Sequence, residues 1–356
     1  MTNNQVFFLQ LVRLGIGVSG ETANPLKMSW DIKALAEKQG LLDIVLDGIE
    51  KLPEPLHPNE ELLLSWIGAL MNDERHYDIM WKTGCNLSSL FAHNGIRTYV
   101  LKGSVVSECY PNPKHRVSVD LDCFLLPSSG NSDVWEKGNA LVLEAGYRVN
   151  KDFYKNSTFY LPGLVVESHK FLTPFRGNVK LKKLEILLQD MLRNDEGKDR
   201  FEGTDLFRPP VMVSSLFLIE HAYSHFLHEG LTWKHVLDWF LFIRKHNNEI
   251  NWAQFNRWIK EFGFETFYDS FIRMGDLLFG KISEDALTKT DRMMLADIWS
   301  ELDVHESVTG VRGKLALVGN TWRARWKYRY FTDTSWIISL WIQVKGFLFV
   351  KKPELY

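Results

Sequence analysis

Three carboxylates in strand-like sequence form a candidate cation site. Asp120 and Asp122 lie two residues apart in VSVDLDCFLLP, whose first residues alternate between apolar and polar side chains. Residues two apart in a β-strand point to the same face, so both carboxylates are expected on one face. Glu167, in LVVESHKFL, is the third candidate, because a neighbouring strand would bring it alongside. Three such groups repel one another unless a divalent cation neutralises them, and Mg²⁺ prefers oxygen ligands of this kind.

A strand-to-helix turn upstream of these carboxylates offers groups that bind phosphate. It contains Lys102, Gly103 and Ser104 and leads into the short helical segment SVVSECYP. Glycine permits close approach of the backbone, serine adds a hydroxyl, and a helix N-terminus attracts anions. Each feature also has an ordinary structural explanation, because an Asp-x-Asp pair is more often a solvated strand face and a Lys-Gly-Ser turn a plain connection. Their order along the chain is the more informative observation.

Two histidines in a later helical segment are candidates for a metal site or for structural roles. His221 and His225 are four residues apart and therefore share one helical face. With Asp238 or His228 they form a candidate zinc site, although the sequence has no HExxH pattern and no cysteine partner nearby. Histidines with satisfied hydrogen bonds in a core or interface are the favoured alternative. Asp238 is expected to orient one of these histidines, since a buried carboxylate needs a partner.

The side chains named above belong to an α/β segment and to the helical region that follows it. Residues 1–94 show helical periodicity, including one long segment from Glu60 to Ala92. Residues 95–180 give strand, helix, strand, helix and two further strands, and the alternation in the second strand places Val119 on its apolar face. Helical periodicity returns in residues 181–356. We therefore predict an α+β fold in which a small mixed-sheet core is flanked by N- and C-terminal helical regions.

Composition excludes several classes of protein. The 356-residue chain has 42 basic and 44 acidic side chains, so its net charge of −2 gives no overall nucleic-acid signature. Three cysteines, none in a Cys-x-x-Cys pair, are too few for a disulfide scaffold and exclude a zinc ribbon. The first residues lack the basic start of a signal peptide, and no uninterrupted apolar stretch reaches the roughly 18 residues of a membrane-spanning helix. A cytoplasmic protein is therefore expected.

The order of these features resembles the polymerase-β-like nucleotidyltransferase superfamily and, within it, the uncharacterised nucleotidyltransferase family. The matching residues are Leu101-Lys102-Gly103, Tyr110-Pro111, Arg116, Asp120-x-Asp122, Glu167-x-His169, His221, His225, Phe226, Gly230 and Leu237-Asp238-Trp239. The resemblance covers about residues 99–243. The sequence departs from the pattern at Lys102, where many superfamily members have a second glycine, and at Lys234, where an arginine is expected.

The resemblance implies metal-assisted transfer of a nucleoside monophosphate from a nucleoside triphosphate, such as ATP, to an acceptor that the sequence does not identify. Asp120 and Asp122 would hold the Mg²⁺ that binds the triphosphate, and with Glu167 they would hold a second ion near the acceptor. Glu167 would also serve as base for the acceptor hydroxyl. The nucleotide-binding residues that the resemblance implies are Lys102, Gly103, Ser104, Arg116, His225 and Asp238. The helical region would pack over the cleft and contribute polar groups to it.

Two other functions remain open at this point. The first is a protein that keeps the nucleotidyltransferase fold and binds a nucleotide or a partner without turnover. Lys102 in the glycine position favours this alternative, whereas the intact set of three carboxylates opposes it. The second is a small-molecule or glycan-pathway enzyme that works at a membrane surface. Arg116 also has an ordinary alternative, a solvated arginine in a polar loop.

The C-terminal segment differs from the rest of the chain in charge. Residues 310–356 carry nine Lys or Arg side chains and two acidic ones, with aromatic residues interleaved. Such a segment is a candidate for weak contact with an anionic membrane surface or, less favoured, with a nucleic-acid backbone. In the favoured alternative its aromatic side chains dock onto the helical region and its charges stay solvated.

Overall fold

Six strands form one mixed sheet in the computed structural model, which describes residues 1–18, 20, 30, 32–130, 133–151, 154–175, 178–300, 322, 324–332 and 335–337. The strands are β1 (Ile96–Val100), β2 (Asp120–Pro127), β3 (Arg148–Asn150), β4 (Asn156–Leu161), β5 (Leu164–His169) and β6 (Leu206–Phe207). Their order in the sheet is β3-β4-β5-β2-β1-β6. The central strand β2 pairs antiparallel with β1 and parallel with β5. The predicted α+β fold with a mixed sheet is confirmed.

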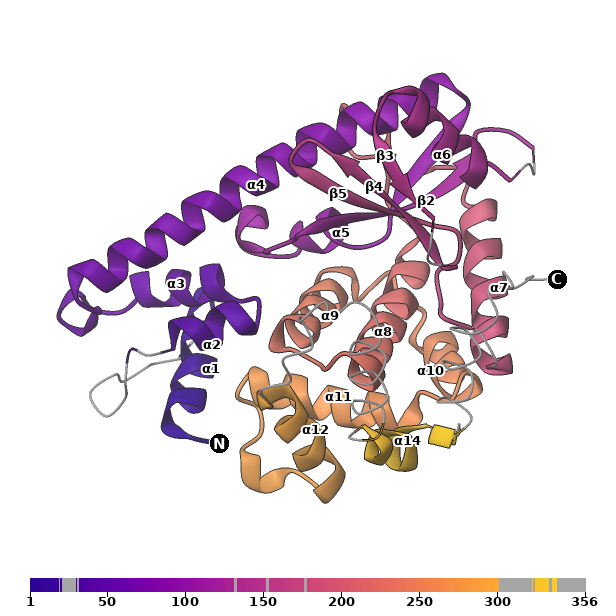
Figure 1. Ribbon diagram of the computed structural model, residues 1–356. Helices are drawn as coiled ribbons and strands as arrows, with labels where there is room; N and C mark the ends of the chain where they lie inside the picture. The colour runs from indigo at the N-terminus through magenta and orange to yellow at the C-terminus, as the bar shows by residue number, and fades with distance from the viewer. Residues whose placement is uncertain are drawn as a thin grey trace.

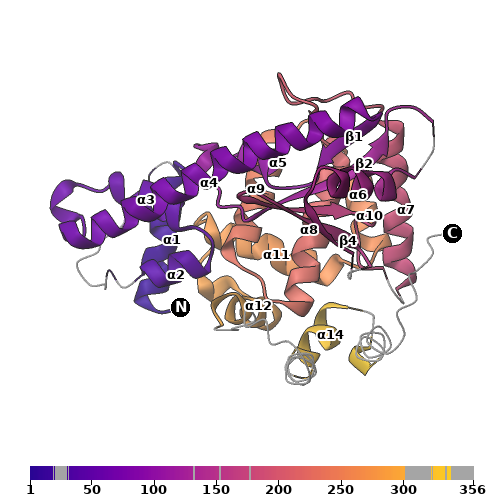
Figure 2. The ribbon, with the colours of Figure 1, turned by 45° about the horizontal axis from the view of Figure 1, so that its top comes forward.

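The 34-residue helix α4 (Glu60–His93) reaches from the N-terminal helices to the sheet, as both ribbon views show (Figure 1, Figure 2). The Asn59 side chain caps it by accepting a hydrogen bond from the Leu62 N–H at 2.9 Å, and two glutamates follow in its first turn. At its other end Gly95, with φ of 73°, turns the chain into β1. Helices α4 and α6 (Trp135–Glu144) both contact β2.

Helices α1 (Asn3–Gly15) and α3 (Leu42–Glu50) pack closely because each contributes a glycine where the two helices meet. Helix α2 (Lys33–Lys38) lies between them in the chain, and the turn η2 (Glu54–Leu56) follows them. A Cβ on Gly15 would lie 2.0 Å from the Ile44 carbonyl oxygen, and one on Gly48 would lie 2.1 Å from that of Leu11. Any larger residue would therefore push α1 and α3 apart.

A helical body covers the other side of the sheet from α4 (Figure 1). Its helices are α7 (Val179–Asn194), α8 (Val211–His228), α9 (Trp233–His246), α10 (Trp252–Glu261), α11 (Glu265–Leu278), α12 (Lys289–Trp299) and α14 (Arg325–Phe331), with the turn η4 (Glu284–Ala286). The short helix α5 (Ser104–Ser107) and the turn η3 (Pro113–His115) connect β1 to β2, and α5 contacts α9. The buried side chains of the sheet and the helical body belong to one hydrophobic core.

The alternating pattern at the start of β2 predicted a buried Val119, and the structure differs there. Val119 is 71% exposed, because β2 begins only at Asp120. From Leu121 onward every residue of β2 is buried, on both faces of the strand. Alternation therefore does not continue along a strand whose two faces are both covered.

The basic aromatic C-terminal segment is described only in part, since residues 301–321, 323, 333–334 and 338–356 lie outside the described residues. Tyr328 and Phe331 of α14 are buried against the helical body, as docking of the aromatic side chains requires. The expectation that the charges stay solvated is wrong for Lys327, which is 2% exposed, with its Nζ 2.7 Å from Asp297 Oδ1. None of the helices in the described ranges is long and apolar enough to cross a membrane.

Candidate active site

The predicted carboxylates lie side by side on two parallel strands. Asp122 of β2 is in register with Glu167 of β5, and Asp120 is in register with Val165. Registered residues of neighbouring strands share a face, so the three carboxylates project from the same face of the sheet. Phe124 pairs with His169 in the same register, which brings the His169 imidazole next to Asp122.

Asp122 is the buried centre of this group. Its carboxylate lies 3.0 Å from Lys102 Nζ through Oδ2 and 2.9 Å from His169 Nε2 through Oδ1. Burial alone would raise the pKa of Asp122, but the Lys102 ammonium and His169 outweigh burial and hold it below its usual value. Glu167 differs, because burial and the negative charge of Asp122 together raise its pKa. The two neighbouring carboxylates are therefore poised differently, Asp122 as a permanent anion and Glu167 as a stronger base.

The turn from β1 to α5 positions the Lys102 side chain. The Leu101 N–H donates to the Asp122 carbonyl oxygen at 3.0 Å and so extends the pairing of the two strands. Gly103 then turns the chain with φ of 64°, a conformation that favours glycine. Ser104 is the first residue of α5, and its buried hydroxyl has no hydrogen-bond partner among the described residues. A buried hydroxyl without a partner is costly unless a ligand completes it.

Arg116 and Asp238 bind each other rather than solvent or a histidine. Arg116 donates from Nε to Asp238 Oδ1 at 2.8 Å and from Nη2 to Asp238 Oδ2 at 2.7 Å, and the Tyr110 hydroxyl donates to Oδ1 at 2.6 Å. Both charged residues are buried. The expectation that Asp238 orients a histidine is therefore wrong, as is the alternative of a solvated Arg116. The paired groups connect the segment before β2 to helix α9.

Three histidines cluster beside Lys102, and one of them was missed from the sequence. His221 and His225 of α8 and His235 of α9 each have a ring nitrogen within 4.8 Å of the others. His225 Nδ1 lies 3.0 Å from Glu229 Oε2, and His221 Nε2 lies 3.5 Å from Lys102 Nζ. The two residues predicted to complete a zinc site with His221 and His225 do not join this cluster. Asp238 binds Arg116, and His228 is exposed, with its Nδ1 hydrogen-bonded to the Ser224 carbonyl oxygen. His235 joins the group because α8 and α9 pack together, which residue spacing does not reveal.

The family model for uncharacterised nucleotidyltransferases matches residues 30–280. The chain belongs to this family. No curated protein and no solved structure gives a significant match. The matched range extends beyond the resemblance visible in the sequence, so the common region of the family includes α4 and much of the helical body as well as the sheet. Membership places the protein among the nucleotidyltransferases, a class of transferases that move nucleoside monophosphates.

In this nucleotidyltransferase the residues on β2 and β5 fit a divalent cation. Asp122, Glu167 and His169 each present a ligand atom within 4.8 Å of the others. Carboxylate oxygens suit Mg²⁺, and an added imidazole nitrogen is also accepted by Mn²⁺. His169 was not among the predicted ligands, although Glu167-x-His169 has the same two-residue spacing as the aspartates. His169 Nδ1 lies 3.3 Å from the Phe171 carbonyl oxygen, which directs Nε2 toward Asp122.

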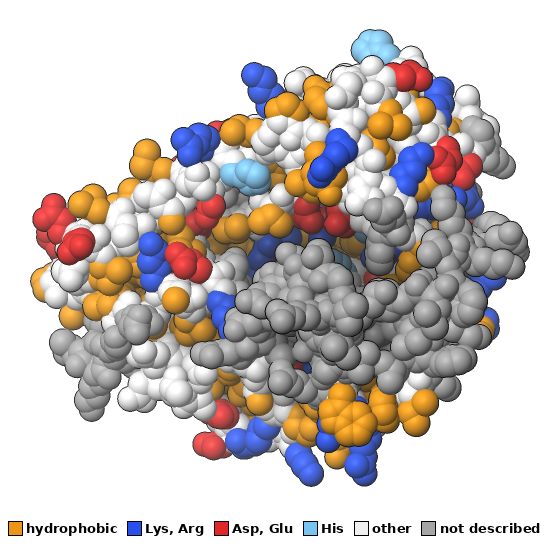
Figure 3. All heavy atoms as spheres, viewed as in Figure 1, with side chains coloured by type: hydrophobic (Ala, Val, Ile, Leu, Met, Phe, Trp, Pro, Cys, Tyr) orange, Lys and Arg blue, Asp and Glu red, His pale blue; other side chains and the backbone are white. Residues whose placement is uncertain are grey.

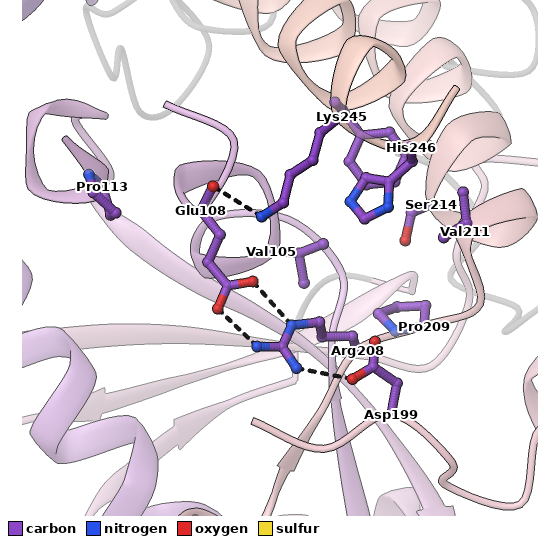
Figure 4. Close-up of a pocket in the computed structure, with 11 residues that line it drawn as sticks. Val105, Glu108, Pro113, Asp199, Arg208, Pro209, Val211, Ser214, Lys245 and His246 are labelled. Atoms are coloured by element: carbon purple, nitrogen blue, oxygen red, sulfur yellow. Dashed lines mark hydrogen bonds and ion pairs between the residues drawn. The ribbon is translucent and has the colours of Figure 1, made fainter. Parts of the chain in front are cut away.

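A cavity of about 540 Å³ lies away from these carboxylates, between α5 and the ends of α8 and α9 (Figure 4). Its charged groups are largely paired with one another. Arg208 contacts Glu108 at 2.7 Å and Asp199 at 2.9 Å, and Lys245 Nζ donates to the Glu108 carbonyl oxygen at 2.9 Å. The cavity includes none of the predicted site residues.

The surface charge is as mixed as the composition indicates. Red and blue side chains are interspersed among the described residues on the face in Figure 3. This agrees with the near balance of 42 basic and 44 acidic side chains. The surface on this face therefore adds no argument for a nucleic-acid acceptor.

Proposed function

We propose that the protein transfers a nucleoside monophosphate from a nucleoside triphosphate to an acceptor, with Mg²⁺ held by Asp120, Asp122 and Glu167. The observation that carries this proposal is the parallel register of β2 and β5, which sets Asp122 beside Glu167 on the face that also bears Asp120. Bound Mg²⁺ would neutralise the triphosphate and stabilise charge on the attacking and leaving oxygens. His169 would orient the Asp122 carboxylate through its 2.9 Å contact.

Glu167 is the proposed base for the acceptor. In the protein without a bound cation, burial and then the charge of Asp122 raise the pKa of Glu167, so its carboxylate binds a proton more readily than that of Asp122. Asp122, whose pKa is held low by Lys102 and His169 despite burial, is suited to hold a cation rather than to exchange a proton. In this proposal Asp122 serves the cation alone, whereas Glu167 also receives the proton of the acceptor on a carboxylate oxygen.

A non-catalytic nucleotide-binding protein is the second candidate, and one observation favours it. The Lys102 ammonium lies 3.0 Å from Asp122 Oδ2, where it already neutralises one of the proposed metal ligands. A protein that never binds a metal ion would keep this pair permanently. In the catalytic proposal Lys102 leaves Asp122 when the metal–nucleotide complex arrives, because the phosphates offer the ammonium a new partner.

Thermal unfolding with nucleotides separates these functions. The wild type would be melted with ATP, GTP, CTP and UTP, each with and without Mg²⁺, beside Asp122→Asn and the control Asp190→Asn, which changes an exposed aspartate on α7. A ligand at one hundred times its Kd stabilises by about 2.7 kcal/mol, which gives a clear shift. We expect at least one nucleotide to raise the melting temperature of the wild type and of the control in a Mg²⁺-dependent way. In Asp122→Asn this Mg²⁺-dependent shift should be absent.

Turnover is then measured as pyrophosphate release from the nucleotide that binds, with acceptors of different chemical classes. Release that depends on Mg²⁺ and on Asp122 supports transfer. A Mg²⁺-independent shift that Asp122→Asn retains, without any pyrophosphate release, would support the non-catalytic candidate instead.

A further inference from the structure

The cavity of about 540 Å³ shown in Figure 4 lies between α5, the beginning of α8 and the end of α9. Its volume is within the range of pockets that hold small molecules. Val105 of α5, Val211 of α8 and Phe242 of α9 bring apolar surface to it from all three helices. A molecule bound here would therefore have an apolar part in contact with these side chains.

Ser214 of α8 brings an unsatisfied polar group to the same cavity. Its side chain lines the cavity and is 1% exposed, and its hydroxyl has no hydrogen-bond partner among the described residues. The next residue of the helix differs, because the Ser215 hydroxyl donates to the Met212 carbonyl oxygen at 3.1 Å. A buried hydroxyl without a partner destabilises the folded protein, and the polar head of a ligand in the cavity would remove that cost.

The beginning of α8 makes this part of the cavity favourable for negative charge. Val211 is the first residue of the 18-residue helix, and Pro210 before it provides no side-chain hydrogen bond to the first turn. The first N–H groups of a helix have no acceptor within that helix and carry the positive end of its dipole. An anion that accepts a hydrogen bond from Ser214, about one turn further along, would lie near this positive end.

Lys245 of α9 supplies a positive charge that no described carboxylate neutralises. Its Nζ donates to the Glu108 backbone carbonyl oxygen at 2.9 Å, and it forms no ion pair with a residue in the described ranges. Arg208 in the same lining differs, because it contacts the Glu108 carboxylate at 2.7 Å and Asp199 at 2.9 Å. Arg208 is therefore part of the wall, whereas Lys245 keeps N–H donors for a ligand.

These groups fit a carboxylate better than a phosphate. One ammonium group and one hydroxyl match the two oxygens of a single carboxylate. A phosphate monoester carries close to two negative charges at neutral pH, and it would also face the carboxylates of Glu108 and Asp199, which line the cavity. Negative charge beyond what Lys245 neutralises is unfavourable in a partly enclosed site.

We propose that this cavity binds a small organic carboxylate, whose charged head contacts Ser214 and Lys245 and whose apolar part contacts the side chains of α5, α8 and α9. The site goes beyond the proposed nucleotide transfer, because it contains none of the residues assigned to metal, nucleotide or proton transfer. Its ligand is accordingly a second molecule, bound independently of the carboxylates on β2 and β5.

Three fluorinated probes with one ring and different heads test this inference. They are 4-fluorobenzoate, the neutral 4-fluorobenzamide and 4-fluorophenyl phosphate, each titrated with the full chain in metal-free buffer without nucleotide and followed by the broadening of its ¹⁹F NMR signal. We expect 4-fluorobenzoate to bind at least about tenfold more tightly than the amide, because the amide has no charge to offer Lys245. Equal affinities of these two, or tighter binding of the phosphate, overturn the carboxylate assignment.

Lys245→Met tests the charged contact. The variant should weaken 4-fluorobenzoate binding by about fivefold or more, since a charge-assisted hydrogen bond is lost at a partly exposed position. Arg244→Met is the matched control, because it removes a neighbouring exposed positive charge of α9 that does not line the cavity. It should bind the probe as the wild type does.

Ser214→Ala tests the buried hydroxyl with two readouts. Binding of 4-fluorobenzoate should weaken by about threefold or more, while the melting temperature of the free protein should stay the same or rise, because the hydroxyl has no partner to lose. Ser215→Ala, which removes a satisfied hydroxyl, should leave probe binding unchanged. No binding by the wild type, or wild-type affinity in either Lys245→Met or Ser214→Ala, overturns the inference.

The outcomes are separate from those of the proposed function. Asp122→Asn should bind 4-fluorobenzoate as the wild type does, because Asp122 does not line this cavity. Probe binding that is lost in Asp122→Asn and kept in Ser214→Ala would place the probe at the carboxylates and overturn the cavity assignment. Probe binding that follows Ser214 and Lys245 supports the cavity site whether or not any nucleotide releases pyrophosphate.

Discussion

Lys102 is the residue on which metal binding and nucleotide binding meet. Its ammonium lies 3.0 Å from Asp122 Oδ2, so it occupies one side of a proposed metal ligand. Without nucleotide, a metal ion must compete with this intramolecular cation. With nucleotide, the phosphates can receive the ammonium, and metal and triphosphate are then expected to bind together. The same contact therefore links the two halves of the proposed site.

Removing the Lys102 charge should let the carboxylates bind a metal ion without nucleotide. In Lys102→Met the charge of Asp122 loses its nearest cation, and the free protein should bind Mn²⁺ at least about tenfold more tightly than the wild type, as the release of one close ion pair predicts. Titration of Mn²⁺ followed by electron paramagnetic resonance measures this. Lys114→Met, which breaks the exposed 2.7 Å contact with Asp78, is the control. Unchanged Mn²⁺ affinity in Lys102→Met would count against Asp122 as a metal ligand.

Residue spacing predicted the carboxylates but not their partners. Asp120, Asp122 and Glu167 follow from the two-residue strand period and from one assumed strand neighbour, both of which are local features. The Arg116–Asp238 contact joins residues 122 apart in sequence, and no local pattern determines such a pair. His235 was missed for the same reason. It lies next to His225 only because two helices pack together, whereas His169 could have been found from its spacing to Glu167.

At the scale of elements, the Arg116–Asp238 pair joins the sheet to the helical body. Arg116 follows η3 and lies before β2, and Asp238 lies on α9. The pair is buried and bidentate, so breaking it leaves an uncompensated charge in the interior. It also sets the position of α9, and with it Lys234, relative to the turn that bears Lys102.

A double-mutant cycle should reveal this coupling between elements. Asp238→Asn alone should lower the free energy of unfolding by about 3–5 kcal/mol, because Arg116 keeps its charge without a partner. Arg116→Met added to Asp238→Asn should recover part of that loss, which gives a clear interaction energy in urea unfolding. The cycle for the exposed Lys114–Asp78 pair is the comparison, and there about 1 kcal/mol or less is expected. Equal interaction energies for the two pairs would contradict the role assigned to the buried one.

The elements themselves were largely predictable because their signals are local. The 34-residue α4 shows in its periodicity and in the capping residue Asn59, and the short strands show in their β-branched residues. β6 was not predicted, since two residues carry no period. The exposed position of Val119 depends on where β2 begins pairing with its neighbours, which is a property of the whole sheet.

At the scale of the whole molecule, Asp43 marks the junction between the N-terminal helices and the rest of the protein. It lies on α3, is fully buried, and neither of its carboxylate oxygens has a hydrogen-bond partner among the described residues. Burial first, then the negative charge of Asp73 on α4, raise the pKa of Asp43 to about 8. His115 of η3 also faces it and acts in the opposite direction, while Asp47 and Glu74 add to the rise. The carboxyl group is therefore neutral in the folded protein at pH 6.

This raised pKa predicts how the stability of the molecule changes with pH. Between the unfolded value near 4 and the folded value of about 8, the folded state binds the extra proton, so the contribution of Asp43 to stability falls as pH rises through this range. Asp43→Asn replaces the carboxyl group with a neutral group of the same shape. It should raise the free energy of unfolding by roughly 3–4 kcal/mol more at pH 8 than at pH 5, because the amide, unlike the carboxyl group, needs no proton to stay neutral in the folded protein. Urea unfolding at both pH values measures the difference, with Asp190→Asn as the exposed control. An effect of equal size at both pH values would show that Asp43 is charged throughout, and that the junction of α3, α4 and η3 tolerates the buried anion.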